Sequence, residues 1–600
     1  MEKKNMGNTV FEKPLSEVEM KASRSGNEAF RISARRKWAE RLLLVFSGVI
    51  YAAAFPDMNW SFLGWVALMP LFWIIKEQTP GQAWRAGFLW GYAWSLTAFF
   101  WLREIETFIP YGMSLILALF PAFWAMAVPP LFRYLLIPSH IQLKGYHEVR
   151  KFKGSNPFME ILFVFALASS WSITEWIRTW IATGLPWNFL GVTQWQNISL
   201  IQISEYTGVY GVSFLLAAVN ISLALAVRNW INSYSEGRYR RPYPLITSLL
   251  LVMLVVVIGY RSALKYRPLK ENSIRLTAAI LQGDIPQCRA GTEKQTVYAL
   301  DKYSSLTRLA LIMKPDIIIW PETAVPLPFR ADHPLCAEYR NRIRGFIKES
   351  GIPFLIGSID FGDVPKNADR IPDIYNSALF INKKGEIADK YYKIHIVPFG
   401  EFVPFADYFP KLVKWIGMGR NLSRGTLYSP LEIKPGVKGG MNICFEDIFP
   451  YISRNHTLAG ANLLLVITND AWYPKSSEPE QHLANSVFRA VENRRPMIRS
   501  GNNSCSCLIM PNGFISDTLF VEILPDGKKK LNTIKRGEGY TNFIIDIDKN
   551  PPLTFYTRFG DVFILLCFII LGFASGLALW NWRQKKQCLL KILSGSPPDK

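Results

Sequence analysis

Cys444 is the residue whose neighbours best prepare it to act as a nucleophile. A short apolar run ends at Ile443 and changes abruptly after Cys444 to an acidic pair, Glu446 and Asp447, and then to a helical pattern. This change predicts a strand that turns sharply into a helix and presents the first side chain to a cleft. The ordinary alternative is a buried structural cysteine, because free cysteines are among the most buried residue types.

Two further polar side chains also follow predicted strands at once. Glu322 stands in the run Trp-Pro-Glu-Thr, and Lys393 stands in Lys-Tyr-Tyr-Lys-Ile-His. Alone, such a glutamate can cap a helix and such a lysine can be solvated. With Cys444 they form a set for acyl transfer through a thioester, in which Glu322 takes the thiol proton and Lys393 lies beside the oxyanion. The backbone N–H of Phe445 would be a further oxyanion donor.

The composition favours a membrane protein over a metal-binding or nucleic-acid-binding one. Half of the 600 residues are hydrophobic, 20 are tryptophan, and the mean hydropathy is +0.11. The net charge of +21 comes from basic residues in short stretches between apolar segments, as in cytoplasmic loops, so we expect no nucleic-acid partner. The seven cysteines and six histidines form no CxxC and no HExxH pattern, so we expect no metal and no cofactor.

The chemistry-bearing residues lie in a polar α/β region between apolar segments of membrane-spanning length. The predicted spans are about 41–55, 60–77, 83–101, 108–136, 159–178, 206–228, 244–261 and 562–580. Basic residues gather in alternate loops, on the same side as the N-terminus: Lys76, Arg85, Lys144, Arg150, Lys151, Lys153, Arg228, Arg238, Arg240 and Arg241. The opposite loops carry only Arg103 and Arg178. Seven spans therefore deliver residue 262 outside the cytoplasm.

The predicted organisation has five parts. A basic cytoplasmic arm covers 1–40, a bundle of about seven helices covers 41–261, an α/β domain covers 262–556, a last helix covers 557–582 and a cytoplasmic tail covers 583–600.

In the α/β domain, apolar runs predict strands over 276–281, 316–320, 353–358, 376–381, 440–444, 462–468, 504–510 and 542–547. Helical patterns lie between them, over 297–313, 336–349 and 481–493. This alternation predicts a layered α/β sandwich tethered to the membrane at both ends.

Several separated motifs resemble those of one family. They are FLGWVAL at 62–68, GLPWN at 184–188, LQGDIPQ at 281–287, VPFGEFVP at 397–404, TNDAW at 468–472, QHL at 481–483 and RAVENRRP at 489–496. Together with the sequence runs around Glu322, Lys393 and Cys444, these motifs make the chain resemble the apolipoprotein N-acyltransferases. That family is the membrane-bound branch of the nitrilase (carbon-nitrogen hydrolase) superfamily. The resemblance implies a membrane α-helical bundle of about eight helices and a nitrilase-like α-β-β-α sandwich.

The resemblance also implies roles and partners. Glu322, Lys393 and Cys444 would form the catalytic triad. Supporting positions would be Glu401, Glu446 and Phe445, and candidate substrate-binding residues are Asn469, Trp472 and Tyr473. A phospholipid, expected to be phosphatidylethanolamine, would donate its acyl chain to the N-terminal amine of a diacylglyceryl lipoprotein. The enzyme would be a monomer in a bacterial inner membrane, with its catalytic domain in the periplasm.

Other functions and one departure from the family remain open. A membrane-tethered amidase or acyl hydrolase would use the same residues with water as the acceptor. A transporter would need ionisable residues inside the spans, where Glu175 is the clearest candidate. The family typically carries a tryptophan on the loop after Gln287, whereas this chain has Cys288–Gly291. His395 and His482 near the motifs are expected to be hydrogen-bonding scaffold.

Overall fold

The computed structural model describes most of the chain. The described residues are 35–56, 58–136, 156–236, 241–265, 272–287, 292–363, 372–403 and 421–593. Several predicted features lie outside these ranges. They are the first 34 residues of the predicted arm, the basic residues at 144–153, Arg238, Arg240, the loop Cys288–Gly291 that departs from the family, and the end of the tail.

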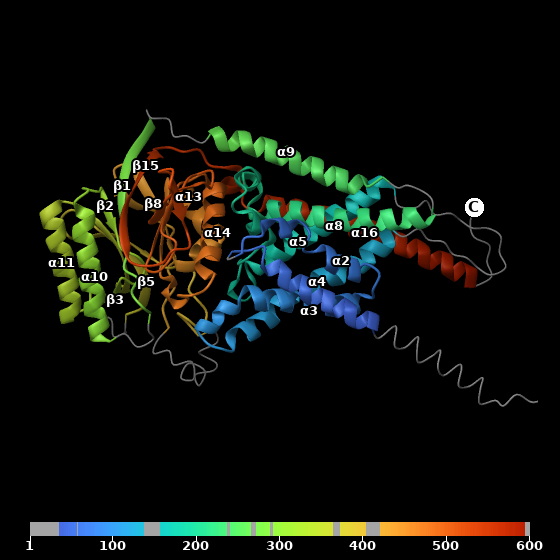
Figure 1. Ribbon diagram of the computed structural model, residues 1–600, viewed down its shortest axis with the longest axis horizontal. Coiled ribbons are helices and arrows are strands. Elements are labelled where there is room, and N and C mark those ends of the chain that lie inside the picture. The colour runs from blue at the N-terminus through green and yellow to red at the C-terminus, as the bar shows by residue number, and fades with distance from the viewer. Residues whose placement is uncertain are drawn as a thin grey trace, which may run out of the picture.

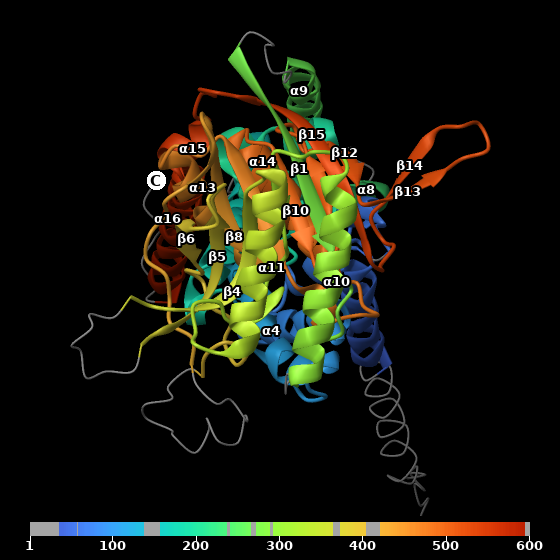
Figure 2. The same cartoon turned by 90° about the vertical axis from the view of Figure 1, so that its left-hand side faces the viewer.

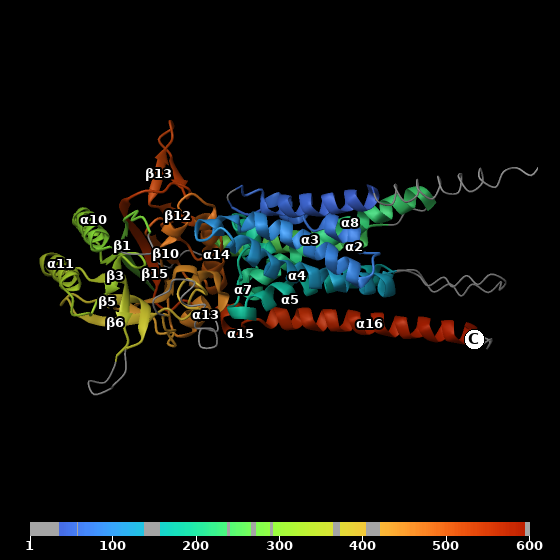
Figure 3. The same ribbon diagram turned by 90° about the horizontal axis from the view of Figure 1, so that it is seen from below.

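The N-terminal part is a helical bundle, joined by the last long helix (Figures 1 and 3). A helix over 35–52 comes first. The other long elements are α2 (Met69–Ile75), α3 (Pro80–Ala98), α4 (Ile109–Leu131), α5 (Pro157–Arg178), α8 (Val209–Glu236), α9 (Tyr243–Lys265) and α16 (Val562–Leu593). Among the described residues, five helices are long and apolar enough to cross a membrane: Ile109–Leu136, Pro157–Arg178, Val209–Ile231, Tyr243–Lys265 and Val562–Gln587. The membrane part is confirmed, but the predicted count of eight spans is not.

The segment predicted as a span over 60–77 is not one helix. It consists of a 3₁₀ turn, η1 (Ser61–Trp65), followed by the short α2. The reason lies on α8, where the buried Asn220 side chain accepts a hydrogen bond from Leu68 N–H (2.8 Å) and donates one to Gly64 C=O (2.9 Å). This amide satisfies the backbone groups that the break leaves unpaired in an apolar environment.

The α/β domain contains two packed sheets. The first has the order β15-β1-β2-β4-β5-β6, with β3 also paired to β4, and the second has the order β12-β11-β10-β9-β8-β7. The strands of the first sheet are β1 (Ser273–Gln282), β2 (Ile317–Ile319), β3 (Val325–Pro328), β4 (Phe354–Phe361), β5 (Ile374–Ile381), β6 (Ile387–Tyr392) and β15 (Gly539–Asp548). Those of the second are β7 (Leu431–Lys434), β8 (Val437–Ile443), β9 (Leu463–Thr468), β10 (Met497–Gly501), β11 (Cys507–Ile509) and β12 (Ile515–Thr518).

The helices complete four layers. They are α10 (Glu293–Leu311), α11 (Pro334–Ser350), α13 (Pro450–Leu458), α14 (Glu478–Asn493) and α15 (Phe555–Phe559). Figure 2 shows α10 and α11 side by side over the first sheet, with a separate hairpin of β13 (Phe520–Ile523) and β14 (Lys529–Asn532) projecting sideways. In Figure 1, α14 lies between the second sheet and the membrane bundle. The α-β-β-α sandwich predicted from the resemblance is therefore confirmed.

Apolar residues alternate between the layers as the two-residue strand period requires. In β1, Ala278 and Ile280 face the other sheet, whereas Ala279 and Leu281 face α10 and α11. In β9, Leu465 likewise lies in the core between the sheets. Alternate β9 residues join a different core, one that continues through α14 into the membrane helices. The α/β domain and the bundle therefore share one hydrophobic core.

Gln481 on α14 makes the densest polar contact across this junction. Its amide nitrogen donates to the backbone carbonyls of Pro56 (3.0 Å) and Ala98 (3.2 Å). Its amide oxygen accepts hydrogen bonds from three membrane-part side chains: Trp101, Trp187 and Asn188. One buried side chain thus fixes α14 against three separate segments of the bundle.

A close contact between α3 and α4 depends on glycine and predicts an asymmetry between two substitutions. A Cβ added at Gly91 of α3 would lie 2.3 Å from Pro121 Cγ of α4, whereas a Cβ at Gly112 of α4 would meet open space. Gly91→Ala should therefore lower the apparent unfolding temperature in detergent, with a loss of about 1–3 kcal/mol from overpacking. Gly112→Ala should leave it equal or higher, because alanine favours a helix. An unchanged Gly91→Ala protein would contradict this close packing.

Candidate active site

Cys444 stands on the sharp turn that the sequence predicts. Strand β8 ends at Ile443, and a 3₁₀ turn, η7 (Cys444–Ile448), begins at once. Cys444 has φ of +57°, a left-handed conformation that is uncommon for a residue other than glycine. Such strain at a strand-to-helix turn is the geometry that exposes a nucleophile above the end of a sheet.

Glu446 ties this turn to the segment that carries the lysine. Its buried carboxylate accepts backbone hydrogen bonds from Ile443 (2.8 Å), Ile394 (2.7 Å) and His395 (2.9 Å), and it also accepts one from the hydroxyl of Tyr391. Burial raises the pKa of Glu446 to about 7, although these backbone donors oppose the rise. The carboxylate therefore joins the end of β8 to the end of β6, on the other sheet.

Lys393 follows β6 directly and lies between two carboxylates. Its ammonium is 3.0 Å from Glu401 Oε1 and 3.7 Å from Glu322 Oε1. The amide nitrogen of Asn376 donates to the same two oxygens, at 2.7 Å to Glu322 and 2.8 Å to Glu401. The ammonium also lies 5.2 Å from the centre of the Phe445 ring. The structure therefore brings Glu322, Lys393 and Glu401 together, next to the residue after Cys444.

Backbone packing fixes the position of Glu322. The side chain follows β2 and precedes Thr323, whose φ is +49°. The neighbouring strand β4 has Gly357 opposite this corner, where a Cβ would lie 2.3 Å from Pro321 O and 2.6 Å from Glu322 Cα. Only glycine lets the backbone of Glu322 come so near the sheet.

The three groups of the predicted triad set one another's protonation. Burial opposes the charge of Lys393, but the neighbouring carboxylates Glu401 and Glu322 outweigh it and raise the Lys393 pKa above its usual range. Burial raises the pKa of Glu322, and Lys393 partly offsets this rise. Burial and the nearby Glu322 raise the pKa of the Cys444 thiol well above its usual value. The resting thiol is therefore protonated, and attack requires a base.

The three predicted substrate-binding residues occupy different surroundings. The Asn469 amide donates to Gln287 (2.8 Å) and accepts from Asn502 (3.0 Å), so both of its ends take part in a protein network. Tyr473 packs edge-to-face on Trp101 of the membrane part, with ring centres 4.7 Å apart, and it lies within electrostatic reach of Cys444. Trp472 is 38% exposed at the surface. Of the three, Tyr473 is the residue whose ring contact joins the membrane part to the surroundings of Cys444.

The histidines near the motifs lie within hydrogen-bond networks. His395 Nδ1 is 2.6 Å from the Tyr451 hydroxyl, and its ring stacks on Phe449 with ring centres 3.7 Å apart. Burial lowers the pKa of His395 to about 3, so its imidazole stays neutral. His482 contacts Asp447 through Nε2. The scaffold role expected for each of the two residues stays a prediction.

Sequence reasoning missed two supporting residues. Asn376 lies at the start of a predicted strand and Tyr391 in the run before Lys393, but neither was singled out. A buried amide and a buried phenol need hydrogen-bond partners, and here the partners are the carboxylates of the site. A polar residue inside an apolar strand was the only signal for Asn376.

Comparisons with known proteins agree with this geometry. Residues 47–222 match the model of the apolipoprotein N-acyltransferase N-terminal domain, and residues 277–519 match that of the carbon-nitrogen hydrolases. An apolipoprotein N-acyltransferase of Geobacter metallireducens is 34% identical, over 88% of this chain and 92% of its own length. One of Rickettsia typhi is 28% identical, over 88% and 96%. The crystal structure of an amidase from Nesterenkonia sp. is 15% identical, covers 50% of this chain and 97% of that one, and has a TM-score of 0.32.

The fold and the family models place the α/β domain among the carbon-nitrogen hydrolases. The chain as a whole belongs to the apolipoprotein N-acyltransferase family, because the Geobacter relative matches it over both parts. It is therefore an acyltransferase, and the resemblance stated from its motifs is confirmed.

The raised thiol pKa predicts how Cys444 reacts with an alkylating agent. The rate of iodoacetamide modification should rise continuously from about pH 6 to about pH 9, because thiolate is the reactive form. Glu322→Gln removes a negative neighbour, so modification at a given pH should be as fast or faster, while acyl transfer falls on the order of 10²-fold or more. Peptide mass spectrometry assigns the adduct to Cys444. A plateau below neutral pH would indicate a standing thiolate–ammonium pair instead.

Proposed function

We propose that this enzyme moves a fatty acyl chain from a phospholipid, through a thioester on Cys444, to the N-terminal amine of a diacylglyceryl lipoprotein. The observation that carries the proposal is the Glu322–Lys393–Glu401 cluster, held beside the Cys444 turn at the end of a core shared with membrane helices. The names of the relatives in Geobacter and Rickettsia support the acceptor class.

In the first half-reaction, Cys444 Sγ attacks the carbonyl carbon of the sn-1 ester while Glu322 takes the thiol proton. Negative charge develops on the carbonyl oxygen beside the Lys393 ammonium and the Phe445 N–H. The C–O bond then breaks, Glu322 returns its proton to the leaving alkoxide, and a lysophospholipid departs. The acyl chain remains on sulfur as a thioester.

In the second half-reaction, the lipoprotein amine attacks the thioester carbonyl, and Glu322 accepts the proton that the amine loses. The C–S bond breaks, the amide product leaves, and the Cys444 thiolate recovers a proton from Glu322. Glu401 and Asn376 hold the lysine and the base through both steps, because their hydrogen bonds involve the same two groups. The site returns to its starting protonation state.

The position of the site suits two membrane-held substrates. Phe445 and Phe449 belong to the hydrophobic core that continues into the bundle, and Tyr473 meets Trp101 there. A lipid substrate confined to the bilayer surface can therefore reach the thiol without leaving it, which raises its effective concentration. We expect phosphatidylethanolamine as the donor and a monomer as the working unit.

We place the α/β domain in the periplasm of a bacterial inner membrane. Support comes from basic residues gathered at one end of the bundle. Lys76 lies within electrostatic reach of Arg36 and Arg228, and Lys585 Nζ approaches the carbonyl of Arg133 at 3.4 Å. In Figure 3, the C-terminal end of α16, which carries Lys585, lies away from the sheets. Basic residues favour the cytoplasmic face, so the sheets would face outward.

A covalent intermediate is the direct test of this reaction. After incubation of the wild-type protein with phosphatidylethanolamine vesicles, mass spectrometry should find an acyl adduct on Cys444. Cys444→Ala should show none, and Cys444→Ser almost none, because an alkoxide forms much less readily than a thiolate. Lys393→Ala should slow adduct formation on the order of 10²-fold or more, because it removes an oxyanion donor.

The molecule that accepts the acyl chain from Cys444 distinguishes acyl transfer to a lipoprotein from hydrolysis by water. Adding a diacylated lipopeptide should discharge the adduct and give an N-acylated peptide. Free fatty acid without that product would assign the site to an acyl hydrolase. Phosphatidylglycerol vesicles of the same chain length are the matched control for the headgroup.

The membrane orientation predicts which introduced cysteine an impermeant reagent can reach. Asp526→Cys lies in the exposed turn between β13 and β14, and Lys586→Cys lies at the far end of α16. In a background with Cys288, Cys444 and Cys588 replaced by serine, a charged maleimide should label Asp526→Cys in intact spheroplasts. Lys586→Cys should react only after permeabilisation. The reverse pattern would place the catalytic domain in the cytoplasm.

A further inference from the structure

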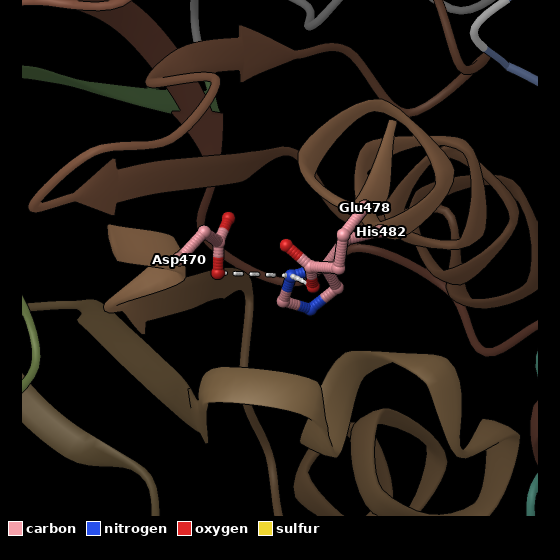
Figure 4. A group of neighbouring side chains, drawn as sticks. All are labelled: Asp470, Glu478 and His482. Carbon is pink, nitrogen blue, oxygen red and sulfur yellow. Dashed lines mark ion pairs between the residues drawn. The ribbon is translucent and has the colours of Figure 1, made fainter. Parts of the chain in front are cut away.

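Three buried side chains outside the triad converge on one point. Asp470 lies in η8 (Asp470–Trp472) after β9, and Glu478 and His482 lie one turn apart on α14. One ligand atom from each lies within 4.8 Å of the other two. Figure 4 shows both carboxylates beside the imidazole ring. We propose that Asp470, Glu478 and His482 bind a divalent first-row metal ion, with Zn²⁺ as the best match.

The orientation of His482 is that of a metal ligand. Its Nε2 contacts Asp447, and its Nδ1 points to the two carboxylates, at 3.5 Å from Asp470 and 3.8 Å from Glu478. Metal-ligating histidines almost always pair their other ring nitrogen with a carboxylate or carbonyl, which fixes the tautomer. With Nε2–H donated to Asp447, the Nδ1 lone pair faces the point where the carboxylates meet. Two ligands that share one ion at about 2.0–2.2 Å are separated by such distances.

Glu478 supplies an independent indication. Its side chain is only 3% exposed, and within the described part of the chain its Oε2 has no hydrogen-bond partner. The same holds for His482 Nδ1, at 0% exposure. An unsatisfied buried carboxylate oxygen is costly unless a cation or a donor reaches it. Glu478 Oε1 faces His482 Nδ1 at 3.8 Å while Oε2 of the same carboxylate has no partner, so a bound cation would satisfy this buried group.

The pairing of the neighbouring charges leaves two carboxylates facing the imidazole. Asp447 is paired with Arg499 and contacts His482 Nε2. Nearby Arg536 is paired with Glu480. Asp470 and Glu478 are therefore the carboxylates that face His482 Nδ1. One imidazole nitrogen and two carboxylate oxygens suit Zn²⁺ or Mn²⁺.

The ion would join three segments that meet near the nucleophile. Asp447 stands in η7, which begins at Cys444. Asp470 follows Asn469, whose side chain reaches Thr323 beside Glu322 at 3.3 Å. His482 and Glu478 belong to α14, the helix that contacts the membrane bundle. The inferred role is structural: the ion fixes η7, the end of β9 and α14 in one arrangement.

The test compares two acidic residues on the same turn of α14. The full-length protein, purified in detergent without chelators, should contain about one equivalent of Zn²⁺ or Mn²⁺ by inductively coupled plasma mass spectrometry. Glu478→Gln keeps the shape of the side chain but should lose the metal. Glu480→Gln, whose carboxylate faces Arg536, should retain it. Prolonged chelation should lower the unfolding midpoint of the wild type by about 5 °C and leave that of Glu478→Gln unchanged.

X-ray absorption at the bound metal gives a readout that needs no variant. The expected nearest shell contains one imidazole nitrogen and at least two oxygens at about 2.0–2.2 Å. Wild-type protein with no more metal than Glu478→Gln, and no response of its unfolding midpoint to added Zn²⁺, would overturn the proposal. In that case a protonated His482 between Asp447 and Asp470 would account for the cluster. A sulfur-containing shell would also overturn it.

Discussion

Helix α14 is the constraint on which the rest of the structure depends. All of its residues from Glu478 to Asn493 are buried, although helices on a protein surface usually keep one polar face in water. One side covers the second sheet, and the other lies against the bundle, where Gln481 contacts three segments and Glu492 accepts a hydrogen bond from Val209 N–H (3.0 Å). Sheet and membrane helices therefore cannot separate without exposing a buried face of this helix.

The chemistry depends on a second connection, between the two sheets. Cys444 ends a strand of one sheet, Lys393 ends a strand of the other, and the Glu446 carboxylate hydrogen-bonds to the backbone beside both. A carboxylate that accepts several backbone donors is a strong and directional link in a dry interior. The spacing between nucleophile and ammonium is thus set by backbone hydrogen bonds and not by the flexible lysine side chain.

The sequence predicted those parts of the structure that rest on local pattern. The strands at 276–281, 440–444 and 462–468 were identified because they are continuous apolar runs buried on both faces. Strands β3, β6, β7, β10 and β12–β14 were missed. Most of them are short and carry charged or exposed residues, and β10, although buried throughout, is a short run interrupted by Arg499. The members of the proposed triad could be named from residue types and family motifs, and their catalytic roles stay a prediction. Asn376, Gln481 and the Asp470–Glu478–His482 cluster could not, because their partners lie far away in sequence and only the folded chain brings them together.

Helix α16 gives the polypeptide a particular order of assembly. It is translated after the entire α/β domain, yet it packs beside α5, where Trp176 donates to Asp561 (2.8 Å), and Asn581 donates to the carbonyl of Tyr134 (2.8 Å). The earlier helices must therefore wait in the bilayer with one flank uncovered while the nearly three hundred residues of the α/β domain are synthesised and fold. Insertion of the last helix then closes the bundle, so a chain interrupted before that point would display an open lipid-facing seam that membrane quality control can recognise.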